Sequence, residues 1–248
     1  MTTSVPGELV AALQRARHVV ALTGSGISAE SGVPTFRDAQ TGLWAKFSPE
    51  ELATPEAFAR DPAFVWSWYA WRRELVERAQ PNPGHFALAE LTSLVRRFTL
   101  VTQNVDGLHQ RAGSRDVIEF HGNILRDRCS GGCSQPRRIS DPRLRIGPLR
   151  RCGCGALLRP DVVWFGEMIP PAALEAASDA TRDCDVFLSI GTSSMVYPAA
   201  GFAEEARGSG ATLVEVNPAV TPVSGSADFV LRDPAGVALP RLLTALRG

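Results

Sequence analysis

A glycine-rich turn near the start of the chain carries the first residues whose spacing suggests a chemistry. The run TGSGISAESGVPTFRD spans residues 23–38, and its Gly24, Gly26 and Ala29 fit the G-x-G-x-x-G/A spacing of dinucleotide-binding turns. Glycines at these positions allow the backbone to approach a phosphate closely. A dehydrogenase would continue into a crossover helix and a second strand ending in an acidic residue, but residues 34–38 interrupt that pattern. The turn therefore predicts a bound nucleotide without a redox domain.

Polar side chains that could do acid-base chemistry follow two further apolar runs. Asn104 and Asp106 come after FTLV, and His121 comes after VIEF. Because ligands of open α/β sheets bind at the strand ends, we expect this amide, carboxylate and imidazole to form one polar site. An imidazole titrates near neutral pH and suits a general base. A lone histidine is more often a core or surface residue, so the catalytic assignment of His121 depends on its neighbours.

Two later strand ends could hold the other half of a dinucleotide. The apolar run in CDVFLSIGTSS ends at Gly191, Thr192 and Ser193, and TLVEVN ends at Asn217. The hydroxyl groups could bind phosphate or ribose, and Asn217 could contact the adenosine ribose. Ordinary strand-to-helix turns have the same composition, and this alternative stays open for either segment taken alone.

Four of the five cysteines form two close pairs. Cys129 and Cys133 are separated from Cys152 and Cys154 by a stretch rich in Gly, Arg and Pro, with little helix or strand periodicity. We expect one structural zinc ion, held by four thiolates, to supply the folding energy that such a segment lacks. The spacings C-x3-C and C-x-C differ from paired C-x2-C, so a loop of free thiols or a lost site is the alternative.

A long helix is predicted after residue 60. Asp61 is a plausible N-cap with Pro62 at the first helical position, and we expect the helix to continue through Gln80. Its apolar stripe consists of Val65, Trp68, Leu75 and Ala79.

An arginine interrupts this apolar stripe. Arg72 fills the gap between Trp68 and Leu75, and Tyr69 lies beside it at the i, i+3 spacing of one helix face. A guanidinium on an apolar stripe is costly unless an anion pairs with it. The anion is either a ligand or an internal carboxylate such as Glu50 or Glu51, and both interpretations remain open.

Composition excludes some partner classes. The 248 residues are 44% hydrophobic and 21% charged, which is typical of a globular protein with one large core and a small module. A formal net charge of zero argues against electrostatic binding to nucleic acid or a membrane. Neither a signal peptide nor an apolar run of membrane-spanning length is visible, so we expect a cytoplasmic protein.

Six segments together resemble the sirtuins, the NAD-dependent protein lysine deacylases. In chain order they are GSGISAESGVPTFRD, TQNVDGLHQRAG, EFHGN, VVWFGE, GTSSMVYPAA and EVNP. The resemblance covers nearly the whole chain and is greatest to the class III, desuccinylase-like branch, because Tyr69 and Arg72 match its Y-x-x-R pair. Two departures are Ser25, where the family usually has Ala, and Val105, where Ile is common.

The resemblance implies an α/β fold with a Rossmann-like parallel sheet. That NAD-binding domain would comprise residues 1–40, 82–122 and 158–248. A helical insertion, residues 41–81, would carry the acyl pocket, and residues 123–157 would form the zinc-binding module.

The resemblance also implies a set of site residues. His121 would be the general base, and Asn104 and Asp106, with Ile27 and Phe36, would hold the nicotinamide carboxamide. NAD would be bound by Gly24, Ser25, Gly26, Ile27, Ala29, Phe36, Arg37, Gln103, Asn104, Asp106, His121, Gly191, Thr192, Ser193, Asn217 and Ala235. The peptide would bind by β-augmentation to Val163, Phe165, Gly166, Glu167 and Val196. The acyl group would meet Ala53, Tyr69 and Arg72.

The implied activity is NAD-dependent removal of succinyl, malonyl or acetyl groups from protein lysines. Its products would be nicotinamide, O-acyl-ADP-ribose and free lysine, and its partners would be NAD and acylated lysine in proteins or peptides. Two alternatives use the same pocket. One is an ADP-ribosyltransferase or NAD glycohydrolase, and the other is a non-catalytic NAD-sensing module.

Overall fold

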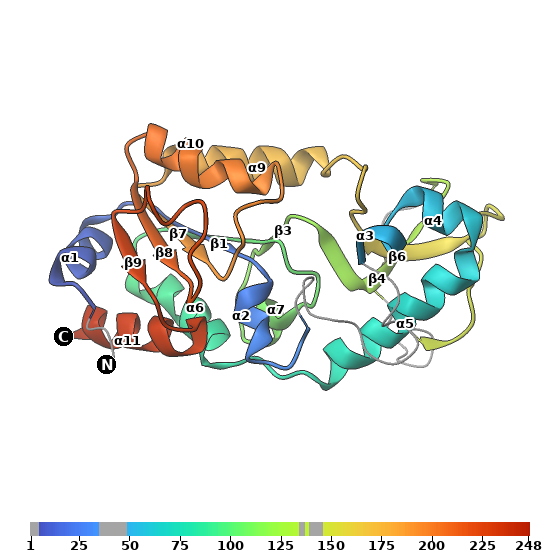
Figure 1. The fold of residues 1–248 in the computed structure, drawn as a ribbon, viewed down its shortest axis with the longest axis horizontal. Coiled ribbons are helices and arrows are strands. Elements are labelled where there is room, and N and C mark those ends of the chain that lie inside the picture. Colours follow the sequence, from blue (N-terminus) through green and yellow to red (C-terminus); the bar gives the residue numbers. More distant parts are fainter. Residues whose placement is uncertain (1–4, 35–48, 134–136, 139–145) are drawn as a thin grey trace.

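The computed structural model of this chain describes residues 5–34, 49–133, 137–138 and 146–248. A large part built on a parallel sheet lies at one end, and a smaller part with helices α3 to α5 and a second sheet lies at the other (Figure 1). Among the described residues, no helix is both long and apolar enough to cross a membrane.

The large part is organised by a six-stranded sheet in the order β3-β2-β1-β7-β8-β9. All five pairings between neighbouring strands are parallel, as predicted for a Rossmann-like fold. The chain leaves β1 toward β2 and β3 on one side and returns to β7, β8 and β9 on the other. The strands are β1 (Val19–Thr23), β2 (Phe98–Thr102), β3 (Ile118–Glu119), β7 (Val186–Ile190), β8 (Thr212–Val216) and β9 (Phe229–Leu231).

Both faces of this sheet are covered by helices. In β1, Val19 and Ala21 join one hydrophobic core whereas Val20 and Leu22 join another, because alternate residues of a strand point to opposite faces. Helices α1 (Gly7–Arg15), α6 (Pro83–Leu94) and α11 (Ala235–Arg247) pack on the first face. Helices α9 (Pro171–Asp183) and α10 (Phe202–Gly208), with the short η2 (Ala199–Gly201), cover the second. Two short helices, α2 (Ser25–Ala29) and α7 (Leu108–Arg111), lie in the described segments that follow β1 and β2.

The smaller part combines helices with an antiparallel sheet. Its elements are α3 (Pro49–Leu52), α4 (Pro55–Arg60), α5 (Pro62–Arg78), β4 (Gly122–Cys129), β5 (Arg137–Arg138) and β6 (Leu158–Val162). Strand β4 is the middle strand of the three. Its separate core packs α4 and α5 against β4 and β6 through residues that include Phe58, Trp68, Ile124 and Trp164. Strand β6 lies just beyond the expected 157/158 boundary and pairs with β4, while the division into domains stays a proposal.

The start of α5 is confirmed. The Asp61 side chain accepts a hydrogen bond from the Phe64 N–H at 3.0 Å, and Pro62 is the first helical residue. The helix ends at Arg78 rather than Gln80, because the backbone at Ala79 is extended. Leu75 is only partly buried, whereas Arg73, which the apolar pattern does not predict, is completely buried.

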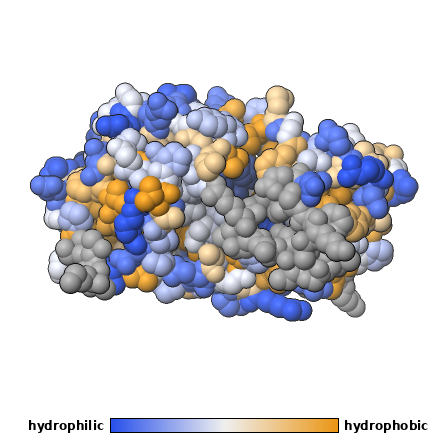
Figure 2. All heavy atoms as spheres, in the orientation of Figure 1, coloured by the Kyte–Doolittle hydropathy of each residue, from blue (hydrophilic) through white to orange (hydrophobic). Residues whose placement is uncertain are grey.

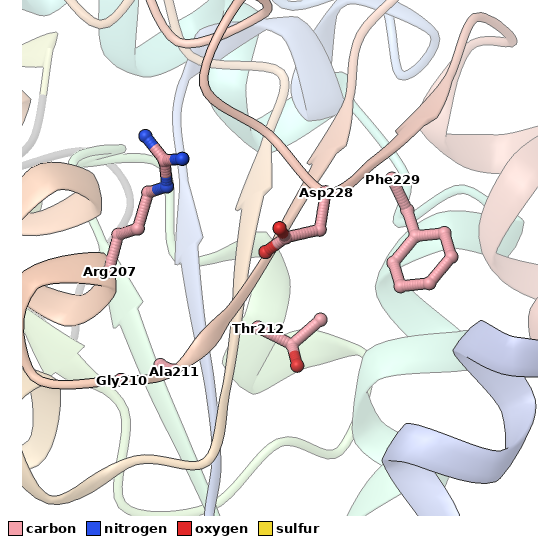
Figure 3. A pocket seen from close by; sticks show the side chains of 6 residues that line it. All are labelled: Arg207, Gly210, Ala211, Thr212, Asp228 and Phe229. Carbon is pink, nitrogen blue, oxygen red and sulfur yellow. The ribbon is translucent and has the colours of Figure 1, made fainter.

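A shallow pocket of about 410 Å³ lies where β8 and β9 begin (Figure 3). Arg207 of α10, Thr212 and Asp228 contribute its polar side chains. The predicted catalytic residues instead follow the carboxyl ends of the strands. This pocket is therefore separate from the site described below.

On the face seen in Figure 2, hydrophilic residues are spread over both ends of the molecule.

Candidate active site

The predicted site residues meet at the point in the sheet where the order of the strands reverses. Strands β1 and β7 are neighbours, and the chain continues from them to opposite sides of the sheet. Thr23, at the end of β1, lies in register with Thr102 of β2 and with Ile190 of β7. The polar segments that follow these strands therefore lie side by side, at the position where ligands bind in open α/β folds.

The glycines of the first turn are required by packing within the protein itself. The Gly26 N–H donates to the Gly191 carbonyl oxygen at 2.8 Å, and a Cβ at Gly26 would lie 2.7 Å from that oxygen. Gly191 has a φ of 57°, and a Cβ there would lie 2.6 Å from the Ile27 nitrogen. The two turns thus touch backbone to backbone, which joins the two segments predicted to hold the two halves of a dinucleotide.

Asn104 and Asp106 are joined through a serine that the sequence analysis missed. The Ser28 hydroxyl donates to Asp106 Oδ2 at 2.7 Å and accepts from Asn104 Nδ2 at 3.0 Å. Asn104 also donates to the Gly24 carbonyl oxygen at 3.0 Å. Burial raises the pKa of Asp106, and hydrogen bonds from Leu108 and Ser28 oppose this rise. A hydroxyl directly after the glycine turn was the available sign of this role.

His121 is held in one tautomer by the backbone. Its Nδ1 lies 3.1 Å from the Gln103 carbonyl oxygen, which can only accept, so Nδ1 carries the proton and Nε2 carries the lone pair. Burial lowers the pKa of His121, which keeps the ring neutral at pH 7. A neutral ring with a lone pair on Nε2 is the form that a general base requires.

Thr192 connects the remaining predicted nucleotide residues. Its hydroxyl accepts from Gln103 Nε2, and its carbonyl oxygen accepts from Asn217 Nδ2, both at 2.9 Å.

Ala235 is buried, and its backbone lies 3.0 Å from the position that a Cβ on Gly84 would take. Ala29 is exposed at the end of α2. The predicted residues Phe36 and Arg37 lie outside the described part of the chain.

Tyr69 and Arg72 are both buried, with 2% and 8% of their surface exposed. The guanidinium carbon of Arg72 lies 5.1 Å from the centre of the Trp68 ring. Burial lowers the pKa of Arg72, while Tyr69 and Asp106 favour its charged form. Burial also raises the pKa of Tyr69 to about 12, so its hydroxyl keeps its proton at pH 7. An internal ion pair of Arg72 stays open as an alternative, because the Glu50 side chain lies outside the described residues.

The predicted peptide segment is hydrogen-bonded to both the base and the acyl pocket. The Val163 N–H donates to the His121 carbonyl oxygen, and the Phe165 N–H donates to the Ala53 carbonyl oxygen, both at 2.9 Å. The Glu167 side chain accepts from the Trp164 N–H at 2.9 Å. Phe165 and Val196 are about 40% exposed, so both predicted peptide segments present apolar surface. A peptide strand added here could pair with the Gly166 N–H, which lacks an acceptor among the described residues. It could also pair with backbone carbonyl groups.

The four predicted metal ligands come together. All four Sγ atoms lie within 4.8 Å of one another, and Cys133 Sγ is 3.4 Å from that of Cys129 and 3.3 Å from that of Cys152. Zn–S bonds of about 2.3 Å in a tetrahedron separate sulfur atoms by roughly 3.8 Å, so a modest adjustment admits the ion. The Cys154 N–H lowers the pKa of Cys152 to about 6, which favours its thiolate form. Despite the unusual spacing, the cluster fits a four-cysteine structural zinc site.

Comparison with protein families identifies this combination of sites. The model of the Sir2 family matches residues 24–198, which include the glycine turn, His121 and the four-cysteine cluster. The chain belongs to the Sir2 family. An NAD-dependent protein deacylase of Methylococcus capsulatus is 51% identical over 97% of this chain and 96% of its own length. NAD-dependent protein deacylase 2 of Pyrobaculum aerophilum is 52% identical over 95% of this chain and 93% of its own.

Solved structures of Sir2 proteins share the whole fold. A Sir2 homologue crystallised with NAD has a TM-score of 0.92 and 46% identity, over 100% of this chain and 96% of the homologue. A complex of Sir2 with a p53 peptide and NAD+ has a TM-score of 0.84 and 32% identity, over 96% of both chains. The expected Rossmann-like fold of this Sir2 family member is confirmed. Both structures contain NAD, which the sequence predicts as the co-substrate.

Proposed function

We propose that this protein is an NAD-dependent protein lysine deacylase that removes succinyl and malonyl groups as well as acetyl groups. Two relatives that cover 97% and 95% of this chain are named NAD-dependent protein deacylases, which supports the same activity here. The acyl range rests on one observation, the buried pair Tyr69 and Arg72 in the core of the smaller part. Arginine and a tyrosine hydroxyl together offer hydrogen-bond donors that suit a terminal carboxylate.

NAD, when bound, would supply the leaving nicotinamide and the ribose carbon that accepts the acyl oxygen. Asn104, Ser28 and Asp106 form a linked polar group that could hold the nicotinamide carboxamide. The second half of the nucleotide would be held by Gly191, Thr192, Ser193 and Asn217. The backbone contact between the two glycine turns supports binding of both halves to one rigid surface.

His121 would act as the general base on a ribose hydroxyl. Its Nδ1–H is directed to the Gln103 carbonyl oxygen, which leaves the Nε2 lone pair for the proton. Its lowered pKa keeps the ring unprotonated at neutral pH, at some cost in basicity. The hydrogen bond between the His121 carbonyl oxygen and Val163 supports a fixed position of the base relative to the peptide.

The acyl chain would extend toward helix α5. Ala53 has a small side chain, and its carbonyl oxygen is hydrogen-bonded to Phe165 of the peptide-binding segment. Such a residue leaves room for an acyl chain longer than acetyl. The terminal carboxylate would then meet Arg72 and the Tyr69 hydroxyl, where its negative charge suits a guanidinium on an apolar helix face.

Initial rates on one peptide carrying acetyl-, succinyl- or malonyl-lysine test this function. We expect turnover of all three only with NAD, with release of nicotinamide and O-acyl-ADP-ribose. Nicotinamide release without O-acyl-ADP-ribose would indicate an ADP-ribosyltransferase or glycohydrolase, and NAD binding without turnover would indicate a sensing module. Activity on acetyl-lysine alone would contradict the proposed acyl range while leaving deacylation intact.

A further inference from the structure

The Tyr69 hydroxyl has a neighbour that determines its hydrogen-bonding direction. The indole Nε1 of Trp164 lies 2.8 Å from Tyr69 Oη, and both side chains are 2% exposed. An indole N–H can only donate, so the tyrosine oxygen must accept in this bond. The hydroxyl hydrogen of Tyr69 is therefore available to a different partner. Among the described residues it has no acceptor.

Trp164 is itself held from several sides. Its backbone N–H donates to Glu167 Oε2, and its ring lies under the Arg159 guanidinium, 3.2 Å from the guanidinium carbon. Arg159 also forms an ion pair with Glu167 at 2.5 Å. The centre of the Phe58 ring lies 5.2 Å from the centre of the Trp164 ring. The indole therefore has little freedom to rotate away from Tyr69. It connects the predicted peptide-binding segment to the predicted acyl pocket.

We propose that Trp164 is a positioning residue that sets the hydrogen-bond polarity of the acyl pocket. By donating to the Tyr69 oxygen, it turns the hydroxyl hydrogen away from the indole and toward the acyl group. The pocket then favours acyl groups that end in an acceptor, of which a carboxylate is the strongest. This inference rests on the proposed acyl range and adds a residue that does not itself touch the carboxylate. The Tyr69 hydroxyl keeps its proton because burial raises its pKa to about 12.

A double-mutant cycle tests the inference. Trp164→Phe keeps an aromatic ring but removes the N–H, and Tyr69→Phe removes the hydroxyl. We expect Trp164→Phe to lower the ratio of desuccinylation to deacetylation, compared as kcat/KM, by roughly threefold to tenfold, the effect of one hydrogen bond. In the Tyr69→Phe background the same change should leave the ratio unaltered, because Trp164 acts through that hydroxyl.

Trp66→Phe is the matched control. Trp66 is also buried, and its indole N–H donates to the Gly147 carbonyl oxygen at 2.7 Å, away from Tyr69. Its replacement should lower stability without changing the acyl ratio. If Trp164→Phe does not fold, benzothienylalanine at position 164 removes the N–H and keeps the ring shape. A parallel fall of both activities, or an equal fall of the ratio with and without the Tyr69 hydroxyl, would overturn the inference.

A second measurement separates this inference from the proposed function. The chain has only two tyrosines, and Tyr197 is 77% exposed. In a Tyr197→Phe background, the ultraviolet titration therefore reports on Tyr69 as the single tyrosine. Removing the indole N–H should raise the pKa of Tyr69 further, because that bond stabilises the ionised form. An unchanged titration would refute the hydrogen bond whatever the substrate. If the titration shifts but the wild type lacks desuccinylase activity, the proposed acyl range fails and the selectivity role fails with it.

Discussion

The ring of His121 is oriented by the carbonyl oxygen of Gln103, which lies 3.1 Å from Nδ1. Gln103 follows β2 directly, and its own side chain donates to Thr192 after β7. One residue thus links the candidate base to the candidate nucleotide segment. Changes at His121 should therefore affect chemistry more than folding, since Gln103 keeps its other contacts.

Replacing His121 tests its role as general base. His121→Tyr should lower kcat for deacylation by at least about 100-fold, the usual contribution of a general base. His18→Gln is the control, because His18 is buried and bonded to Thr99 at the start of the sheet. It should change stability but not activity. Undiminished deacylation by the His121 variant, measured as O-acyl-ADP-ribose formed, would exclude the role.

Acid should destabilise the protein through two buried histidines. The rings of His85 and His109 lie 4.9 Å apart, and burial lowers their pKa values to about 4 and about 3. The unfolded chain, with histidine pKa values near 6.5, therefore binds more protons below pH 6.5, and stability falls as the pH drops toward 4. At pH 5 each histidine should cost about 2 kcal/mol relative to pH 7. The raised pKa of Asp106 acts in the opposite direction.

Urea unfolding at pH 7 and pH 5 measures this effect by comparison of variants. His109→Gln should lose less stability between the two pH values than the wild type does, whatever its absolute stability. Trp66→Phe removes a buried hydrogen bond without a titrating group and should lose as much as the wild type. Equal losses in all three proteins would show that His109 is protonated to the same extent when folded and unfolded.

Zinc should be needed for the fold of the smaller part. About one zinc per chain is expected, and chelation should expose β4 and β6, because Cys129 ends β4 and Cys152 and Cys154 precede β6. Elemental analysis, together with hydrogen exchange of the two strands, checks this. Cys184→Ser is the control, because Cys184 is buried in the core between the large sheet and helices α9 and α10, outside the cysteine cluster. Active, well-folded protein without zinc would contradict the expectation.

The sequence was sufficient to predict which residues lie together at the candidate site wherever their placement follows from position along a strand. Asn104, His121 and Asn217 were predicted because each lies within two residues of the end of a strand, and parallel strands bring such residues to one edge. The four-cysteine cluster was predicted because thiols in a weakly periodic segment need a metal to fold. These inferences need only local pattern and the chemistry of the side chain.

Contacts between segments far apart in the chain could not be predicted in this way. Trp164 and Tyr69 are separated by 95 positions, and an indole N–H meets that particular hydroxyl only because β6 and α5 share a core. Arg73 lies outside the apolar stripe predicted for its helix, yet it is fully buried. Its partner, Asp127, lies 54 positions away on β4, and nothing in the local pattern of either segment indicates the pair.

The ion pair of Arg73 and Asp127 should be essential for stability. Arg73 is 0% and Asp127 5% exposed at the side chain, and their atoms are 2.6 Å apart. Asp127→Asn removes the carboxylate that pairs with this buried guanidinium and also with Arg150, which should cost about 3 to 5 kcal/mol in the free energy of unfolding. Asp179→Asn breaks an exposed pair with Arg182 and should cost less than about 1 kcal/mol. Zinc content of both variants should be measured, because Asp127 is two residues from Cys129. A loss similar to that of the control would mean that water or other residues compensate Arg73.

Arg72 decides the proposed acyl range. A charge-assisted hydrogen bond contributes about 1.5 to 3 kcal/mol, so Arg72→Met should lower desuccinylation roughly tenfold to a hundredfold, while deacetylation is largely spared. Arg72→Lys should lie between the two, because lysine keeps the charge but loses the paired donors of the guanidinium. Arg78→Met, on the same helix but with its side chain 78% exposed, should change neither activity. Initial rates on matched succinyl- and acetyl-lysine peptides give the ratio directly. A parallel fall of both activities would make Arg72 a structural residue that pairs with an internal carboxylate, and the preference for carboxylated acyl groups would then have no physical basis in this pocket.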